Sequence, residues 1–358
     1  MYFNFREQLY CMKKMVFTRC HNVSKLVFLA LIFSLCSCDS GNNGGTTPPP
    51  PTPKTIPIDI VLIAGQSNAA GYSPIQSNQT ETFENVIYAG ETDHTLIGKD
   101  ETIGSDFLSS KDKYVNGVRG GLGHSPNHIG PEYGIAQYFN DQYDESYPLM
   151  IFKTAAGGTT LADVNSNLSG VYGNWISKSK WPSGYEPNIE QASPNNKATG
   201  LLYKLFLENF RSVYQNLIDN DYDPNILGMV WMQGESDADL GGSYIANYGA
   251  TLRTFITDIR EDLSDITNID LKDMPFVIGK IATSYVSYNR EQNTQLIAQQ
   301  TNIANYMGET VDVVETSDLI IKKPDGSRNE GVEDDWHFNF KDMTTLGNRF
   351  AKKLEELL

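Results

Sequence analysis

The feature that most constrains the fold is a regular alternation of short apolar segments with longer amphipathic ones. Five segments are rich in β-branched and apolar residues, as buried strands are. These strands are predicted at residues 58–64, 149–154, 226–232, 276–282 and 311–315. Helical spacing of apolar residues predicts helices at residues 198–218, 244–263, 290–306 and 342–357. The alternation predicts a three-layer α/β/α sandwich with a mostly parallel five-stranded sheet.

Two polar regions interrupt this alternation, at residues 73–128 and 159–197. Both are rich in Gly, Ser, Asn and Asp. Long insertions in a compact α/β domain usually carry function or disorder. We expect these two regions to form the walls of a ligand cleft.

The N-terminal 38 residues have the pattern of an export signal. An apolar run at residues 25–35 follows several basic residues and is shorter than the ~20 residues that a membrane span needs. The four cysteines of the chain all lie in this segment, as Cys11, Cys20, Cys36 and Cys38. No disulfide framework is therefore possible in the rest of the chain. Residues 35–38, Leu-Cys-Ser-Cys, resemble a bacterial lipobox, which makes Cys38 the predicted lipidation site; the alternative is a plain signal peptide with an unmodified cysteine.

Residues 39–55 are dense in Gly, Thr and Pro and are predicted to be a linker, because such a segment cannot bury a core. The predicted organisation is thus a signal peptide with lipobox at 1–38, this linker, and one folded domain at 56–358. We expect an exported protein anchored by lipid to a bacterial membrane, at the cell surface or facing the periplasm. The formal net charge of −16 argues against a nucleic-acid partner and leaves the anchor on Cys38 as the expected membrane contact.

The first chemical motif is Gly-Gln-Ser-Asn at residues 65–68, directly after the first predicted strand. A serine at this place lies at the carboxyl end of the sheet, where α/β proteins bind ligands, and its hydroxyl can act as a nucleophile. A helix N-cap is the alternative role for Ser67. Because Ala69 stands two residues later, the G-x-S-x-G elbow of α/β-hydrolases is absent.

Two further motifs follow predicted strands. Residues 156–159 are Ala-Gly-Gly-Thr, whose glycines allow the backbone to approach a ligand closely. Residues 231–237 are Trp-Met-Gln-Gly-Glu-Ser-Asp, in which Gln233 offers an amide donor suited to an oxyanion hole. We expect Glu235 to be a buried hydrogen-bond acceptor and Asp237 to be a solvated loop carboxylate.

The fourth motif is Asp334-Asp335-Trp336-His337, just before the last predicted helix. An aspartate three residues ahead of a histidine can orient the imidazole, so one short segment supplies a base and its partner. Three other histidines follow the signal, His94, His124 and His128, and they lie in the first polar region, away from any predicted strand end. A structural or surface histidine is the alternative role for His337.

Together these four motifs, with Gly-Pro-Glu at residues 130–132, resemble the SGNH hydrolase superfamily over residues 58–358. The best match is to its carbohydrate O-acetylesterases, namely carbohydrate esterase family 6 and the sialate O-acetylesterase-like proteins. The resemblance implies an SGNH/flavodoxin-like fold, with Ser67 as nucleophile, His337 as base and Asp334 as its partner. It also implies an oxyanion hole from Ser67, Gly157 or Gly158, and Gln233, with Gln66, Asn68 and Glu235 in support. Asp335 stays an alternative to Asp334.

The resemblance implies a serine carboxylic ester hydrolase that removes acetyl groups from an oligo- or polysaccharide of the acetyl xylan or sialic acid type. The implied mechanism needs no metal or organic cofactor, and residues 325–336 lack the glycine and the final acidic residue of a calcium loop. The alternatives are an esterase acting on other short-chain esters and an inactive glycan-binding lipoprotein. Aromatic residues are candidates for stacking on sugars in either case, namely Tyr172, Trp175, Trp181 and Tyr185.

Overall fold

The computed structural model describes residues 55–75, 81–91, 114–162, 173–188, 199–282, 290–323 and 325–358. All of them lie in one compact unit, Pro53–Leu358. The predicted signal segment, the lipidation site Cys38 and the linker up to residue 54 lie outside the described residues. Within those residues, no helix has both the length and the apolar character that a membrane crossing requires.

The centre of the unit is a seven-stranded sheet in the order β4-β3-β6-β1-β7-β8-β9. Its strands are β1 (Ile56–Gly65), β3 (Thr82–Glu91), β4 (Tyr114–Arg119), β6 (Leu149–Ala155), β7 (Tyr222–Met232), β8 (Phe276–Gly279) and β9 (Val311–Val314). Neighbouring strands pair in parallel except β3 with β4, which pair antiparallel. A second, two-stranded sheet joins β2 (Ser73–Pro74) to β5 (His128–Ile129).

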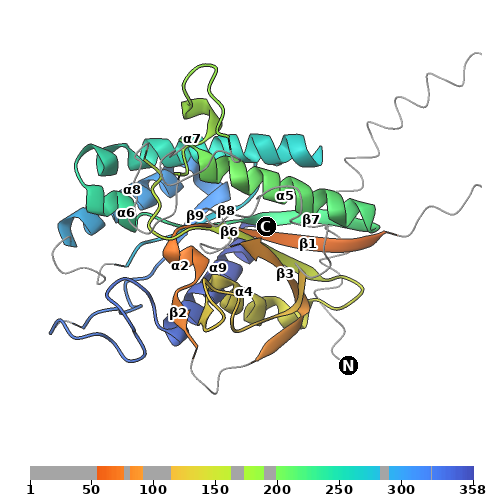
Figure 1. Ribbon diagram of the computed structural model, residues 1–358, viewed down its shortest axis with the longest axis horizontal. Helices are drawn as coiled ribbons and strands as arrows, with labels where there is room; N and C mark the ends of the chain where they lie inside the picture. Colours follow the sequence, from red (N-terminus) through yellow and green to blue (C-terminus); the bar gives the residue numbers. More distant parts are fainter. Residues whose placement is uncertain are drawn as a thin grey trace, which may run out of the picture. The chain divides into compact units, whose positions relative to one another are not determined.

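Helices cover both faces of the large sheet (Figure 1). Helices α5 and α7, with α8 beside α7, lie on one face, while α4 and α9 pack together on the other. The helices are α2 (Ser67–Ala70), α4 (Pro131–Phe139), α5 (Leu201–Asp219), α6 (Glu235–Leu240), α7 (Ser243–Thr267), α8 (Arg290–Met307) and α9 (Phe340–Leu357). The predicted three-layer α/β/α class is therefore confirmed.

The predicted number of strands is wrong, because the sheet has seven strands rather than five. The two missed strands, β3 and β4, lie in the first polar region. In β3, the buried Phe83, Val86 and Tyr88 are interleaved with half-exposed or exposed Asn and Glu residues. A strand near the edge of a sheet needs fewer apolar residues than a central one, so its sequence resembles that of a polar loop.

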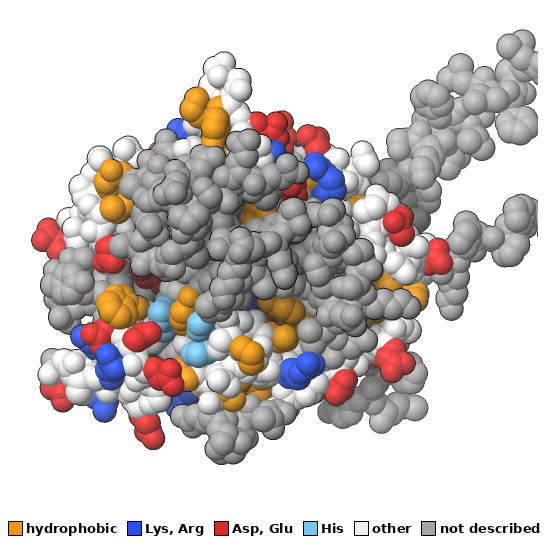
Figure 2. Space-filling model, in the orientation of Figure 1, with side chains coloured by type: hydrophobic (Ala, Val, Ile, Leu, Met, Phe, Trp, Pro, Cys, Tyr) orange, Lys and Arg blue, Asp and Glu red, His pale blue; other side chains and the backbone are white. Residues whose placement is uncertain are grey.

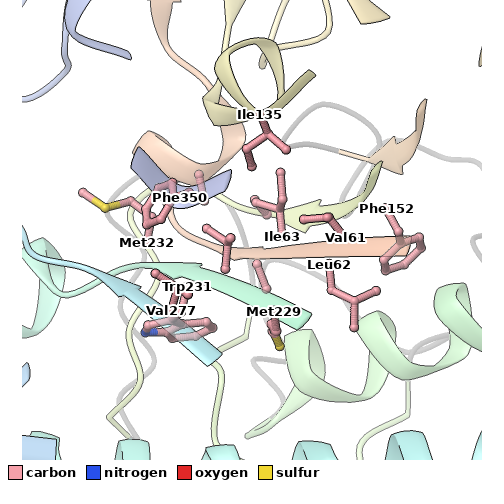
Figure 3. Close-up of a cluster of buried hydrophobic side chains, with 14 of the residues drawn as sticks. Val61, Leu62, Ile63, Ile135, Phe152, Met229, Trp231, Met232, Val277 and Phe350 are labelled. Carbon is pink, nitrogen blue, oxygen red and sulfur yellow. The ribbon is translucent and has the colours of Figure 1, made fainter. Parts of the chain in front are cut away.

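The core forms on both faces of the central strand β1, whose residues from Ile58 to Gly65 are all buried. Figure 3 shows Ile63 pointing toward Ile135 of α4, while Leu62 points to the opposite face, toward Met229 of β7. Phe152, the register partner of Leu62 on β6, packs edge-on against two phenylalanines of α5. This burial on both faces explains why the central strands are predominantly apolar.

The carboxyl ends of the three central strands lie at the same level of the sheet. Gly65 at the end of β1 is in register with Ala155 of β6 and Met232 of β7. Gly65 has a φ of +144°, and a β-carbon there would lie 2.0 Å from the carbonyl oxygen of Met232. Only glycine fits this turn. The motifs that follow these strands are consequently brought to one edge.

Candidate active site

Ser67 stands at the first position of α2, one residue after the extended Gln66 that follows β1. The carbonyl oxygen of Gln66 accepts the N–H groups of Ala69 and Ala70, both at 2.8 Å, and so closes the turn. Gly71 ends the short helix with a φ of +97°. Ser67 is 8% exposed, so this residue is almost entirely buried at the edge of the sheet.

His337 and Asp334 are joined within the loop before α9. The Nδ1 atom of His337 lies 2.6 Å from Oδ2 of Asp334, and the backbone N–H of His337 donates to Oδ1 at 2.9 Å. The backbone N–H of Trp336 also donates to Oδ1, at 2.8 Å. Asp334 thus fixes both the ring and the backbone of the histidine segment.

The electrostatics of this pair define the tautomer of the histidine. Partial burial by itself raises the pKa of Asp334, but the hydrogen bond and the charge of His337, with two backbone N–H groups, outweigh it and lower the pKa to about 2. An ionised carboxylate only accepts hydrogen bonds, so Nδ1 of His337 carries the proton and Nε2 is the basic nitrogen.

Asp335 has a different environment from its neighbour. Its carboxylate pairs with Lys322 at 2.7 Å and with Arg328 at 2.9 Å. Hydrogen bonds from these two cations lower the pKa of Asp335. The structure therefore places Asp334, and not Asp335, against the imidazole of His337.

Asn68 connects the Ser67 turn to the His337 loop. Its Nδ2 donates to the backbone carbonyl of Trp336 at 3.3 Å and to Oε1 of Glu235 at 2.8 Å. Glu235 is 5% exposed, and burial raises the pKa of its carboxyl. The neighbour of the predicted nucleophile thus contacts the neighbour of the predicted base, with Glu235 as the buried acceptor between loops.

Gln233 and Gln66 join the ends of β7 and β1. Nε2 of Gln233 lies within hydrogen-bond distance of three oxygens, on Gln66 at 3.2 Å, Thr159 at 3.1 Å and Asp237 at 2.5 Å. Oε1 of Gln66 also receives the backbone N–H of Gly234 at 3.3 Å. In this arrangement the amide hydrogens of Gln233 point at protein oxygens. Its role in an oxyanion hole remains a prediction.

The expectation that Asp237 is a solvated loop carboxylate is wrong. Asp237 is 1% exposed and accepts the backbone N–H groups of Leu161 and Ala162, both at 2.9 Å. Burial raises the pKa of Asp237 to about 6, against the opposing effect of these hydrogen bonds. Asp237 anchors the loop that follows β6, which a single sequence motif could not reveal.

The two glycines predicted for the oxyanion hole follow β6. The N–H of the preceding residue, Ala156, donates to the carbonyl oxygen of Gly65 at 3.1 Å, so this loop starts beside the Ser67 turn. Gly158 has a φ of +66°, a conformation that favours glycine. Whether Gly157 or Gly158 donates to an oxyanion stays open as a prediction.

His124 and His128 lie in the first polar region of the sequence, yet the fold brings both close to His337. The ring of Tyr72 stacks on His337, with centroids 4.5 Å apart, and on His124 at 3.8 Å on its other side. His128 lies 4.6 Å from His124, centroid to centroid, and burial lowers its pKa. Figure 2 shows the described histidines gathered on one face beside hydrophobic side chains. His94 lies outside the described residues.

A buried ion pair joins the segments of the chain that carry these aromatic rings. Nζ of Lys153 on β6 lies 2.8 Å from Oε2 of Glu132, and both side chains are fully buried. Lys153 also donates to the carbonyl oxygens of Ala70 and Leu122, each at 3.0 Å. Glu132 in turn accepts the N–H of Gly130 at 2.7 Å. The pair therefore connects the end of α2 to the loop that carries His124.

Two other predicted features can be placed. Trp175 is fully buried in the core, so its predicted role in stacking on sugars is wrong. Trp181 and Tyr185 are half-buried, and Tyr172 lies outside the described residues. Within the part of the chain that the structure describes, no group of three or more His, Cys, Asp or Glu residues is arranged to hold a metal ion.

Comparisons with known proteins agree with this architecture. The family model described as carbohydrate esterase, sialic acid-specific acetylesterase, matches residues 57–356. A search of curated proteins gives no match. Among solved structures, the chain resembles that of NanS, with 14% identity and a TM-score of 0.55, over 84% of this chain and 97% of NanS. It also resembles an Arabidopsis thaliana protein, with 15% identity and a TM-score of 0.51, over 83% and 97% of the two chains. These two likenesses show the fold.

Proposed function

This chain belongs to the sialic acid-specific acetylesterase family of carbohydrate esterases, and on that premise we propose that Ser67, His337 and Asp334 carry out its ester hydrolysis. Membership makes the protein a carboxylic ester hydrolase. The observation that supports the triad most strongly is the 2.6 Å contact between Asp334 and Nδ1 of His337, in a loop joined to the Ser67 turn through Asn68.

In the proposed reaction, Nε2 of His337 takes the proton from Oγ of Ser67 while Oγ bonds to the acetyl carbonyl carbon. The tetrahedral intermediate collapses as the protonated His337 gives that proton to the departing sugar oxygen, leaving an acetyl group on Ser67. Water, activated by His337, then attacks the acetyl carbonyl and releases acetate. The ionised Asp334 stabilises the imidazolium form that arises in each half.

The oxyanion would be stabilised by N–H groups at the edge where β1, β6 and β7 end. We propose the backbone of Ser67 and of Gly157 or Gly158 as donors, each typically worth ~3 kcal/mol of barrier. Gln233 would join them if its amide turns from Thr159 toward the substrate. This role is supported by the position of Gln233 next to Gln66, which is adjacent to Ser67.

The test is acetate release from p-nitrophenyl acetate and from chemically acetylated xylan. We expect release from wild-type protein and none from Ser67→Ala. Ser236→Ala is the matched control, because Ser236 stands in another Gly-x-Ser triplet of this domain, also at a strand end, and should retain activity. A folded Ser67→Ala variant that still turns over either substrate would overturn the assignment.

We further propose that the protein acts outside the cytoplasm on an acetylated oligo- or polysaccharide, anchored through Cys38. The export signal and linker in the sequence support this location. The measurement is the amount of protein in the membrane fraction of the producing cells. Cys38→Ser should move the protein out of that fraction, and equal membrane content in both forms would contradict the anchor.

A further inference from the structure

The chain has four tryptophans, and Trp336 differs from the others in what surrounds its ring. Each of the other three donates its indole N–H to a protein oxygen and packs against at least one aromatic ring. The bonds run from Trp175 to Thr159 at 3.0 Å, from Trp181 to Ile176 at 2.9 Å and from Trp231 to Tyr248 at 3.4 Å. The ring contacts pair Trp175 with Trp231 and Trp181 with Tyr203. These three indoles therefore pack against other side chains of the fold.

Trp336 is 45% exposed, directly beside His337 in the chain. Within the described residues, no oxygen accepts its indole N–H and no aromatic ring stacks on it. Hydrophobic side chains adjoin the histidine cluster on the face shown in Figure 2, with charged side chains around them. The structure leaves the largest apolar side chain of this loop open to solvent at the active site.

The backbone of Trp336 is fixed although its side chain is open. Its N–H donates to Asp334 at 2.8 Å, and its carbonyl oxygen accepts from Asn68 at 3.3 Å. Both bonds are to residues that also position the proposed triad. The backbone that carries the indole is consequently held in place next to His337 and the Ser67 turn.

The loop that carries Trp336 is braced on its other side as well. Asp335 is paired with Lys322 and Arg328, and Arg328 also donates to the carbonyl oxygen of Glu333 at 2.5 Å. Asn339 donates to the carbonyl oxygen of Glu330 at 2.9 Å. A surface ordered before binding loses little conformational entropy when a ligand arrives.

We propose that the exposed indole of Trp336 is the binding platform for the sugar ring that carries the acetyl group, an inference that rests on the proposed esterase function. A pyranose ring has apolar C–H faces and a polar rim, so an indole can bury one face while the hydroxyls meet water or charged groups. Charged groups precede Trp336 in the loop, on Asp335 with its two cations and on Glu333, which is exposed. These charged side chains can form hydrogen bonds with the hydroxyl groups at the rim of the sugar ring.

The position next to His337 also selects the kind of ester. On this proposal the platform one residue from the base would lie near the scissile bond, where the group attached to the ester oxygen must be. This placement favours an acetyl group carried on a ring carbon over one carried on a flexible chain remote from the ring. A ring-free ester such as ethyl acetate has nothing to place on the indole.

The experiment compares two substrates, a mono-O-acetylated methyl xylopyranoside and ethyl acetate, by acetate release. p-Nitrophenyl acetate is avoided because its own aromatic ring can stack on Trp336. We expect Trp336→Ala to lower the ratio of kcat/KM for the acetylated xyloside to that for ethyl acetate about tenfold, mainly through KM. Trp336→Phe keeps an aromatic face. It should therefore lower this ratio by less than half as much, on a logarithmic scale.

Tyr306→Ala is the matched control, because Tyr306 is an exposed aromatic residue on α8 at 69% exposure, and its removal should leave the ratio unchanged. An unchanged ratio in Trp336→Ala, with both esters still hydrolysed, would overturn the platform. A ratio that falls equally in the Phe variant would also contradict it, since the loop and not the ring would then be responsible. If wild-type protein released no acetate from either ester, the proposed function itself would fail.

Discussion

Replacing Lys153 by methionine is expected to destabilise the fold by about 3–5 kcal/mol, because it leaves the carboxylate of Glu132 buried without its cation. Both side chains are fully buried and 2.8 Å apart. The ammonium also donates to the carbonyl oxygens of Ala70 and Leu122 and lies 5.4 Å from the ring centre of Tyr88. Methionine fills much of the same volume and supplies none of these hydrogens.

The loss of stability caused by Lys153→Met should depend on the charge of Glu132, which a double-mutant cycle can show. Glu132→Gln keeps an oxygen for the N–H of Gly130, now bonded at 2.7 Å, but leaves Lys153 as a buried charge. Each single variant therefore contains one uncompensated ion, whereas the double variant contains none. We expect the double variant to be more stable than the sum of the singles by at least ~2 kcal/mol.

The assay is urea unfolding followed by tryptophan fluorescence, with the free energy of unfolding extrapolated to water. Lys272→Met is the matched control, because Lys272 and Asp270 form a pair at 3.2 Å in which both side chains are about 70% exposed. Such a pair should contribute under ~1 kcal/mol. Additive effects of the two buried substitutions, within ~0.5 kcal/mol, would refute the reasoning.

Three further predictions concern the site. Asp334→Asn should lower kcat about 10³-fold because His337 loses its orienting charge, whereas Asp335→Asn should lower it less than about threefold; equal losses would contradict the assignment. Tyr72→Leu should lower kcat up to about tenfold and Tyr72→Phe much less, because a phenylalanine ring keeps the stacking on His337; steady-state kinetics decides. Asp237, whose pKa rises from 3.8 to about 6 on folding, stabilises the folded state when protonated. That contribution, about 3 kcal/mol, is complete below pH ~4 and lost as the pH rises through ~6, so Asp237→Asn should flatten this part of the curve of unfolding free energy against pH.

The central strands could be predicted from the sequence because the apolar residues within each strand already indicate that it is buried. β1 is apolar at every position from Ile60 to Ala64, and β6 from Leu149 to Phe152, as is typical of strands covered on both faces. The near-edge strand β3 mixes apolar residues with Thr, Glu and Asn, and no pattern in the sequence indicates that it pairs in parallel with β6. Its place in the sheet follows from packing against α4, which a single sequence does not state.

In the site, too, contacts between residues close in sequence could be predicted, and contacts between residues far apart in sequence could not. Asp334 and His337 are three residues apart, so their contact follows from the loop itself. His124 reaches Tyr72 because the two-residue strands β2 and β5 pair Pro74 with His128, a pairing too short to leave a sequence pattern. Asp237 bonds to backbone groups some 75 positions earlier in the chain, so its burial could not be foreseen.

The most direct test of the account is which residue a serine-directed phosphonate ester labels. Activation of Ser67 by His337 and Asp334 predicts covalent labelling of Ser67, located by mass spectrometry of the digested protein. The labelling should disappear in His337→Ala, because the hydroxyl then has no base, and acetate release should stop in proportion to the fraction labelled. Labelling of a different residue, or full acetate release by protein whose Ser67 is completely modified, would contradict the central claim.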